Sequence, residues 1–371
     1  MSTIDALALT RDLLRFDTVN PPGQEAQCIA HLGRLLGEHG LRTAAVECAP
    51  GRPSLVARLD GSDASAPAIG FTGHVDTVPL GEAAWRREPF AGEVDGDRLF
   101  GRGASDMKSG VAAMVAAVCA VARHGRPRRG IELVLTADEE RGCYGARAIV
   151  AQGGLLGSVG ALVIGEPTGL RPCLGHRGVT WVEASFTGRT AHASAPELGD
   201  NAVLKGCRAA LRAAAYDFEG VRHEHLGPPS LNVGRLAGGQ NLNSVPDQAA
   251  LGIDLRTIPG QTAAGLCRHL SGVLGEGAEL AVIVETPGIW TDPGGAWITG
   301  VIERTRGYGE PGPIAFCTDG SILAPAYGDV PTVILGPGEF DQAHRTDEWC
   351  SMAKVEAATA LYGELMESWA A

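Results

Sequence analysis

The order of helix and strand signals changes once along this chain, between residues 176 and 287. On either side of that segment helices and strands alternate, which predicts a mostly parallel sheet with helices on both of its faces. Within the segment the order is strand, helix, strand, strand, helix, strand, a pattern typical of a small α+β sandwich. The sequence therefore predicts an α/β domain of residues 1–175 and 288–371, interrupted by an inserted α+β domain of residues 176–287.

Hydrophobic periodicity and end signals locate the individual elements. In the first part of the chain, strands are expected at 54–59, 68–73, 131–137 and 161–165, and helices at 24–39, 109–125 and 145–152. In the inserted segment, strands are expected at 179–187, 230–236, 248–257 and 279–286, and helices at 201–217 and 262–275. The last part should contain a helix at 296–307, a strand at 331–335 and a helix at 352–369. The βαββαβ segment predicts a ferredoxin-like sheet with one uncovered face, which often pairs with a second copy.

Composition limits the possible functions. A chain of 371 residues is too long for one ordinary core, so two domains are expected. A net charge of −12 disfavours nucleic-acid binding. The nine cysteines form no CxxC pair, which favours reduced thiols in a cytoplasmic protein over a cysteine zinc cage or a disulfide framework. Neither a signal peptide nor a membrane-spanning run is expected.

Histidines and carboxylates recur at strand ends and in glycine-flanked loops. In 71-FTGHVDTVPL-80, His74 and Asp76 leave the same face of an extended chain. Four further motifs place such residues in similar positions: GRGASDMKSG, LTADEERG, VIGEPTG and LGPGEFDQAHRTDEW. In an open parallel sheet, ligands bind beyond the carboxyl ends of the strands, so these side chains are expected to converge. The residues expected to meet there are His74, Asp106, one of the adjacent pair Glu139 and Glu140, Glu166 and His344.

This set of side chains suits zinc, and cobalt or manganese would also accept it. Two histidines and three carboxylates exceed what one catalytic zinc needs. If one carboxylate bridges, two ions can each hold a histidine and a terminal carboxylate, about 3.5–4 Å apart. Adjacent Glu139 and Glu140 should point in different directions, so one can bind metal while the other acts as a base. For each residue alone, a solvated loop position or a simple turn hydrogen bond is the alternative.

Together these motifs resemble the M20 metallopeptidase family, nearly from end to end and in the family's order. That family includes acetylornithine deacetylase, succinyl-diaminopimelate desuccinylase, aminoacylase and glutamate carboxypeptidase. The resemblance implies an α/β catalytic domain with two zinc ions and an inserted dimerisation or lid domain, and therefore a homodimer. It also implies Asp106 as the bridging ligand, with His74 and Glu166 on one zinc and Glu140 and His344 on the other.

The same resemblance implies roles for residues outside the ligand set. Glu139 would be the general base, and Asp76 would orient His74. The segment 188-GRTAHASAPELGDNAV-203 resembles one whose histidine enters the partner subunit's active site, which makes His192 the candidate for stabilising the oxyanion. A plain loop histidine is the alternative reading.

Further matching stretches suggest residues that bind the substrate. Asn243 and Arg256 are candidates for holding a substrate carboxylate, since an arginine fork pairs with one bidentately. A surface ion pair is the alternative for Arg256. Thr318 lies in a loop that the resemblance places over the substrate.

The expected activity is hydrolysis of a linear amide by a metal-dependent deacylase, with acetylornithine first among the N-acyl amino acids. A succinyl-diaminopimelate desuccinylase, or a dipeptidase or carboxypeptidase of the family, is the alternative. The loop 317-CTDGS-321 departs from the Thr-Glu-Ala of acetylornithine deacetylases. A non-catalytic, metal-binding dimeric scaffold is the alternative from another class. The chain lacks GxGxxG after a strand and lacks GxxxxGK[ST], which argues against nucleotide binding.

Overall fold

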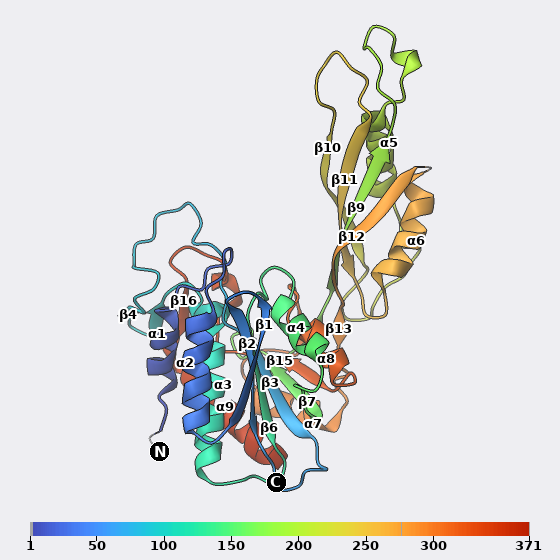
Figure 1. Cartoon of the computed structure of the whole chain (residues 1–371). Helices are drawn as coiled ribbons and strands as arrows, with labels where there is room; N and C mark the ends of the chain where they lie inside the picture. The colour runs from blue at the N-terminus through green and yellow to red at the C-terminus, as the bar shows by residue number, and fades with distance from the viewer. Residues whose placement is uncertain (1–2, 276, 371) are drawn as a thin grey trace. The chain divides into compact units, whose positions relative to one another are not determined.

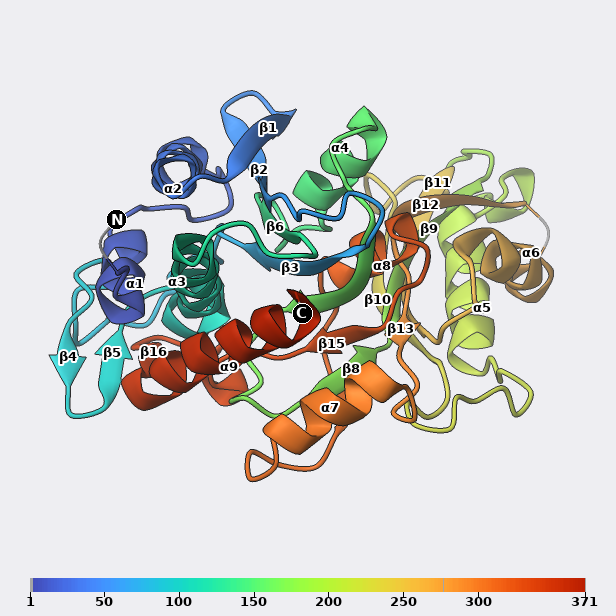
Figure 2. The same cartoon turned by 90° about the horizontal axis from the view of Figure 1, so that it is seen from below.

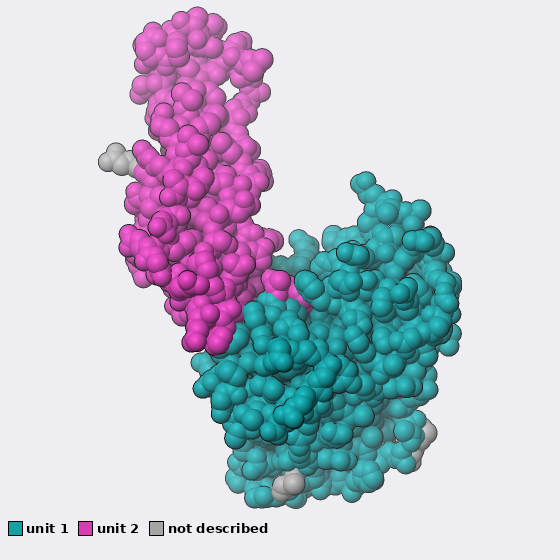
Figure 3. Space-filling model, turned by 180° about the vertical axis from the view of Figure 1, so that it is seen from behind, with its two compact units in different colours: residues 1–175, 290–314, 318–371 teal, residues 176–289, 315–317 magenta. Residues whose placement is uncertain are grey.

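The structure is a computed structural model, which describes residues 3–275 and 277–370 (Figures 1 and 2). It comprises two compact units (Figure 3). Unit 1 contains residues 1–175, 290–314 and 318–371, and unit 2 contains residues 176–289 and 315–317. Residues 288–289 and 315–317, which the sequence analysis assigned to the catalytic domain, therefore group with the inserted segment.

Within the described residues, a nine-stranded sheet forms the centre of unit 1, in the order β1-β2-β6-β3-β7-β15-β8-β13 with β14 paired to β8. Strands β6, β3, β7 and β15 run parallel, whereas β1 and β2 are antiparallel at one edge. The strands span Arg42–Ala49 (β1), Arg52–Leu59 (β2), Ala68–His74 (β3), Ile131–Thr136 (β6), Val159–Ile164 (β7), Cys173–His176 (β8), Ile289–Trp290 (β13), Gly312–Ile314 (β14) and Thr332–Ile334 (β15).

The central strands are apolar along almost their whole length because both faces of the sheet are covered. Phe71, Leu133 and Val163, from three adjacent strands, have no exposed surface. Helices α3 and α9 lie on one face, and α4 and α8 lie on the other (Figure 2). The predicted α/β class, with its mostly parallel central sheet, is confirmed.

Unit 1 contains helices from both the first and the last part of the chain. Their bounds are Ala6–Leu14 (α1), Ala26–Glu38 (α2), Ser109–Arg123 (α3), Tyr144–Gln152 (α4), Ala296–Arg304 (α7), Gly320–Ala326 (α8) and Met352–Ala370 (α9). Asp5 caps α1 by accepting the Leu7 N–H at 2.8 Å.

The helical segment Ala104–Arg123 has the length and composition of a membrane span, but 94% of its most apolar window is buried inside the protein. Its apolar character is therefore accounted for by its place in the core.

A second, three-stranded sheet joins two distant segments of unit 1. Strand β5 (Arg98–Phe100) lies between β4 (Val94–Asp95) and β16 (Trp349–Ser351). Trp349 pairs with Phe100 in the antiparallel register. The chain just before Asp106 therefore lies beside the chain just after His344.

Unit 2 has the predicted βαββαβ order and forms an antiparallel sheet, β10-β11-β9-β12. Side chains of β9 and β11 alternate between buried and more exposed positions, and the buried ones pack against α5 and α6. On the other face, Trp181 is 44% exposed. The elements are Gly178–Thr187 (β9), Ala202–Ala214 (α5), Ser230–Gly238 (β10), Gln248–Thr257 (β11), Ala263–Leu274 (α6) and Ala278–Thr286 (β12).

Candidate metal centre

Three adjacent parallel strands of unit 1 deliver acidic or imidazole side chains to the same edge of the sheet. His74 is the last residue of β3, and Glu166 follows the end of β7. Glu139 and Glu140 lie in the turn after β6, whose last residue, Thr136, pairs with His74. This edge is where the carboxyl ends of parallel strands form a ligand site.

His74, Asp106 and Glu166 form the first group of possible metal ligands, with ligand atoms within 4.8 Å of one another. The His74 Nδ1–H donates to the main-chain carbonyl of Asp76 at 2.9 Å. This bond leaves the Nε2 lone pair facing Asp106 Oδ1 at 3.1 Å and Glu166 Oε1 at 3.7 Å. A histidine whose other ring nitrogen is fixed in this way is ready to bind a metal through Nε2.

Asp106, Glu140 and His344 form the second group. His344 Nε2 lies 3.3 Å from Asp106 Oδ2 and 3.2 Å from Glu140 Oε2. Asp106 therefore presents one carboxylate oxygen to each group. Such sharing is the arrangement expected of a carboxylate that bridges two ions.

The electrostatics of the cluster fit a pair of divalent cations. Burial raises the pKa of Glu166 well above its usual range, and burial together with the nearby Asp106 raises the pKa of Glu140. Hydrogen bonds to Asp106 and Glu140 raise the pKa of His344 to about 10. Among the described residues, the buried Oε1 of Glu140 has no hydrogen-bond partner. The donor types, the crowded negative charge and this unpaired oxygen all match what zinc or a similar ion requires.

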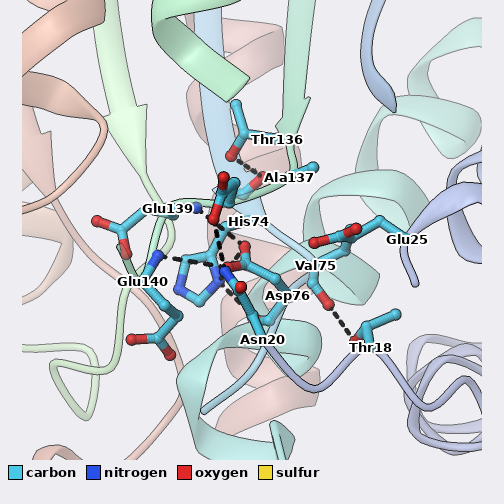
Figure 4. Close-up of polar contacts among 12 residues, drawn as sticks. Thr18, Asn20, Glu25, His74, Val75, Asp76, Thr136, Ala137, Glu139 and Glu140 are labelled. Atoms are coloured by element: carbon cyan, nitrogen blue, oxygen red, sulfur yellow. Dashed lines mark hydrogen bonds and ion pairs between the residues drawn. The ribbon is translucent and has the colours of Figure 1, made fainter. Parts of the chain in front are cut away.

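Asp76 was expected to orient His74 through its carboxylate. The carboxylate lies near His74, but its shorter contacts are to other groups. The carboxylate accepts the backbone N–H groups of Glu139 at 3.1 Å and of Glu140 at 3.3 Å (Figure 4). Its nearest approach to His74 Nδ1 is 3.6 Å. The Asp76 side chain thus fixes the turn that carries Glu139 and Glu140, while its main chain orients His74.

A buried polar network behind this turn was not identified from sequence. Asn20 Nδ2 donates to Asp76 Oδ2 at 2.8 Å and to Asp138 Oδ1 at 2.7 Å. Arg52 Nη1 contacts Asp138 Oδ1 at 2.9 Å and also pairs with Glu25, which is fully buried. The only sequence signal for Asn20 was its place in the turn 19-VNPPG-23.

Glu139 points away from Glu140, so the two side chains diverge from their shared turn (Figure 4). Glu139 belongs to neither of the two groups that share Asp106. It lies instead with Cys143 and Asp319, and the Cys143 thiol donates to Glu139 Oε1 at 3.7 Å. Burial raises the pKa of Glu139 well above its usual range. A partly buried carboxyl in the turn that carries Glu140, outside the two groups that share Asp106, has the position expected of a general base.

In unit 2, His192 and Asn243 come together at one end of β11. His192 is bridged to Ser244, and the Ala193 N–H donates to the Asn243 carbonyl at 3.0 Å. The His192 Nδ1 accepts the Ser194 N–H at 3.2 Å. Both predicted residues are exposed.

Arg256 and Thr318 occupy different surroundings. Arg256 lies towards the opposite end of β11, and its Nη2 pairs with Asp254 Oδ2 at 3.0 Å. Thr318 is fully buried, and its hydroxyl accepts the Gly320 N–H at 3.1 Å beside the first residue of α8. The structure therefore brings Asn243 to His192 but does not bring Arg256 to either of them within unit 2.

An α/β unit in which two groups of possible metal ligands share one carboxylate has the arrangement of a two-metal hydrolase. The sequence model of peptidase family M20/M25/M40 matches residues 70–368, which is most of the chain. The chain belongs to this family.

Similar curated proteins include acetylornithine deacetylases and a succinyl-diaminopimelate desuccinylase. The chain is 30% identical over 309 residues to an acetylornithine deacetylase of Yersinia pestis, covering 80% of this chain and 78% of that protein. It is 32% identical over 318 residues to a succinyl-diaminopimelate desuccinylase of Gluconobacter oxydans, covering 81% of each.

Among solved structures, the fold is similar to a tripeptidase from Staphylococcus aureus, with a TM-score of 0.78 and 22% identity over 100% of both chains. It is also similar to an M20 family metallo-carboxypeptidase from Sulfolobus solfataricus, with a TM-score of 0.78 and 18% identity over 100% of both chains. These matches show the shared fold.

Proposed function

We propose that this protein is a two-metal amide hydrolase that removes the acyl group from an N-acyl amino acid. The observation that carries this proposal is the position of Asp106, which gives one oxygen to each of two ligand groups. His74 and Glu166 would complete one zinc position, and Glu140 and His344 the other. Divalent ions held there supply Lewis acidity to the scissile carbonyl and to the attacking water.

Glu139 is the proposed general base. Its backbone is fixed by the bond from its N–H to Asp76 Oδ1, so its carboxylate is presented beside the ligand groups without joining them. From there it takes a proton from the attacking water and later delivers it to the leaving amine. Cys143, which donates to Glu139 Oε1, helps to hold this carboxylate in place.

His192 is the proposed stabiliser of the oxyanion, contributed by the partner subunit of a homodimer. Because its Nδ1 accepts the Ser194 N–H, the neutral ring carries its proton on Nε2. An exposed Nε2–H can donate to an oxygen that develops negative charge. Since Asn243 lies beside His192, the same copy would present both groups.

Acetylornithine is the first candidate substrate, which the similarity to acetylornithine deacetylases supports. A free α-carboxylate is the proposed common feature of the candidate substrates. Arg256 and Asn243 are the groups proposed to hold that carboxylate, with Thr318 in the loop near it. Because Arg256 and Asn243 lie at opposite ends of β11, one copy cannot use both on a single carboxylate. Two copies of the chain would be needed to do so.

Succinyl-diaminopimelate is the second candidate substrate. The desuccinylase relative is 32% identical to this chain, and the Thr318-Asp319-Gly320 loop differs from the Thr-Glu-Ala expected of deacetylases.

A reducing, cytoplasmic location is also part of the proposal. None of the nine cysteines, all of which lie in the described part of the chain, forms a disulfide, and this supports such a location.

A kcat/KM panel on metal-reconstituted protein tests the proposal. The panel contains N-acetyl-ornithine, N-succinyl-diaminopimelate, other N-acyl amino acids and dipeptides, each repeated after chelation. One N-acyl amino acid should exceed the others by about a hundredfold, equivalent to about 2.7 kcal/mol of transition-state discrimination. Preference for a dipeptide would contradict the deacylase assignment, and turnover that survives chelation would contradict the two-metal mechanism.

The same panel tests the carboxylate-binding role of Arg256. Arg256→Ala should lower kcat/KM about 10–100-fold on substrates with a free carboxylate, because a charge-assisted pair is lost. Arg235→Ala is the matched control, since Arg235 is an exposed arginine on the neighbouring strand β10. Equal turnover by the Arg256 variant and the wild type would remove this part of the proposal.

A further inference from the structure

A buried carboxylate outside the ligand set organises the loop that carries Asp106. Glu348 has no exposed surface. Its Oε1 accepts the backbone N–H groups of Ser105 at 2.8 Å and of Asp106 at 3.0 Å. Its Oε2 accepts the Gly103 N–H at 3.0 Å and Arg102 Nη1 at 2.5 Å. One side chain thus accepts three main-chain N–H groups between residues 103 and 106, including that of the proposed shared metal ligand.

Arg102 connects the Glu348 carboxylate to the loop that carries His344. The arginine is 1% exposed, and its Nη1 also donates to the Arg345 carbonyl at 3.2 Å, directly after His344. Its Nη2 donates to the Pro79 carbonyl at 3.0 Å. The Arg102–Glu348 pair therefore links the segment just before Asp106 to the segment just after His344.

The geometry of the second ligand group depends on these two loops. His344 has a left-handed backbone with φ +64°, a conformation that a non-glycine residue keeps only when its surroundings hold it. Its side chain is 53% exposed, so packing restrains it weakly. The separation of 3.3 Å between His344 Nε2 and Asp106 Oδ2 is then set by the backbones on which the two residues stand.

We infer that Glu348, through its pair with Arg102, is a positioning residue that sets the spacing of Asp106 and His344 and so controls the affinity of the second metal position. This inference rests on the metal ligands proposed above. Groups that orient metal ligands typically change metal affinity about 10–100-fold when they are lost. The four donors around Glu348 make it such a group, because each of them loses a charged acceptor in the Glu348→Gln variant.

The chain offers a matched control in Glu132. This residue is also buried, at 1% exposed, and it pairs with Arg58 while accepting the Gly157 N–H at 2.9 Å and the Tyr327 hydroxyl at 2.5 Å. Glu132 belongs to β6 but lies towards the start of that strand, whereas the metal centre lies beyond its end. Glu132→Gln therefore removes the same kind of buried charge from the same sheet, away from the ligands.

The test is a Co²⁺ titration of the metal-free full-length protein, followed by visible absorption, together with thermal unfolding by circular dichroism. Wild type should bind two ions per chain. Glu348→Gln should raise the dissociation constant of one of the two ions at least tenfold and alter the absorption spectrum. Glu132→Gln should lower the unfolding temperature of the metal-free protein while leaving both dissociation constants within about twofold of wild type.

Wild-type affinity in Glu348→Gln would overturn the inference, as would an equal loss of affinity in Glu132→Gln. If Glu348→Gln does not fold, Arg102→Lys tests the same inference. Lysine keeps the positive charge but lacks the guanidinium group that bonds both Glu348 and the Arg345 carbonyl. Wild-type affinity in that variant would also overturn the inference. A wild-type protein that binds no divalent ion would instead overturn the proposed function, and this inference with it.

Discussion

At the residue scale, Asp106 and Glu140 make different contributions to the two ligand groups. Asp106 belongs to both groups, whereas Glu140 belongs to one. We therefore expect Asp106→Ala to lose both ions on dialysis and Glu140→Ala to retain one ion per chain. Metal content measured by mass spectrometry on folded protein distinguishes the two outcomes. Equal stoichiometries in the two variants would argue against a shared carboxylate.

Glu139 should be needed for turnover but not for metal binding. Because it lies outside the two groups that share Asp106, Glu139→Gln should keep both ions. Loss of the base should reduce kcat by about 10²–10⁴-fold. The measurement pairs steady-state kinetics with metal analysis of the same sample. Unchanged kcat would refute the base assignment.

Residue types in the sequence indicated the members of the two groups that share Asp106 more clearly than the residues that support those groups. His74, Glu140 and Glu166 are polar residues at the ends of apolar strands, and this contrast is visible in sequence. Glu348 and Arg102 show no such contrast in the sequence, because their role depends on a salt bridge between residues that are 246 positions apart. Asp76 was identified from its spacing to His74, but the partners of its carboxylate depend on how the turn after β6 returns to it.

At the element scale, the first turn of α3 packs directly on the chain that leads to Glu166. A Cβ added to Gly110 would lie 2.2 Å from the Gly165 carbonyl oxygen, so Gly110→Ala should lower the thermal unfolding temperature and disturb metal binding. Gly363→Ala is the control, because a Cβ there meets nothing within 4 Å inside α9. It should stabilise the protein by about 1 kcal/mol. A Gly110 variant as stable as wild type would contradict the close packing.

Elements with strong periodicity were predicted well, whereas short or exposed ones were missed. The buried strands β3, β6 and β7 begin and end within a few residues of the expected positions. Strand β1 was not predicted because its first four residues are all exposed and show no alternation. The short strands β4, β5 and β16 form only through pairing between distant segments, which local sequence does not reveal. Helix α5 ends at Ala214, before the predicted residue 217.

At the scale of the whole molecule, each unit has its own apolar core, and all five proposed metal ligands belong to unit 1. Chelation should therefore lower the unfolding temperature of one calorimetric transition and leave a second transition unchanged. At a free metal concentration a hundredfold above its dissociation constant, each ion contributes about 2.7 kcal/mol. Scanning calorimetry with and without a chelator, followed by metal addition, makes the comparison. Two transitions that shift equally would contradict this assignment.

The domain architecture was predictable because it depends on the order of elements and not on their details. A βαββαβ run inside an alternating chain has few alternative folds. The sequence did not predict that residues 315–317 belong to unit 2 together with residues 176–289. Local hydrophobic periodicity carries no signal for this grouping.

The central claim is that Asp106 bridges two metal ions, and anomalous diffraction from crystals grown with zinc tests it most directly. Data collected at the zinc absorption edge should give two peaks about 3.5–4 Å apart in each chain, on either side of the Asp106 carboxylate. One peak should lie against His74 and Glu166, and the other against Glu140 and His344. A single peak, or a peak held by Glu139, Cys143 and Asp319 in place of one of these, would contradict the account.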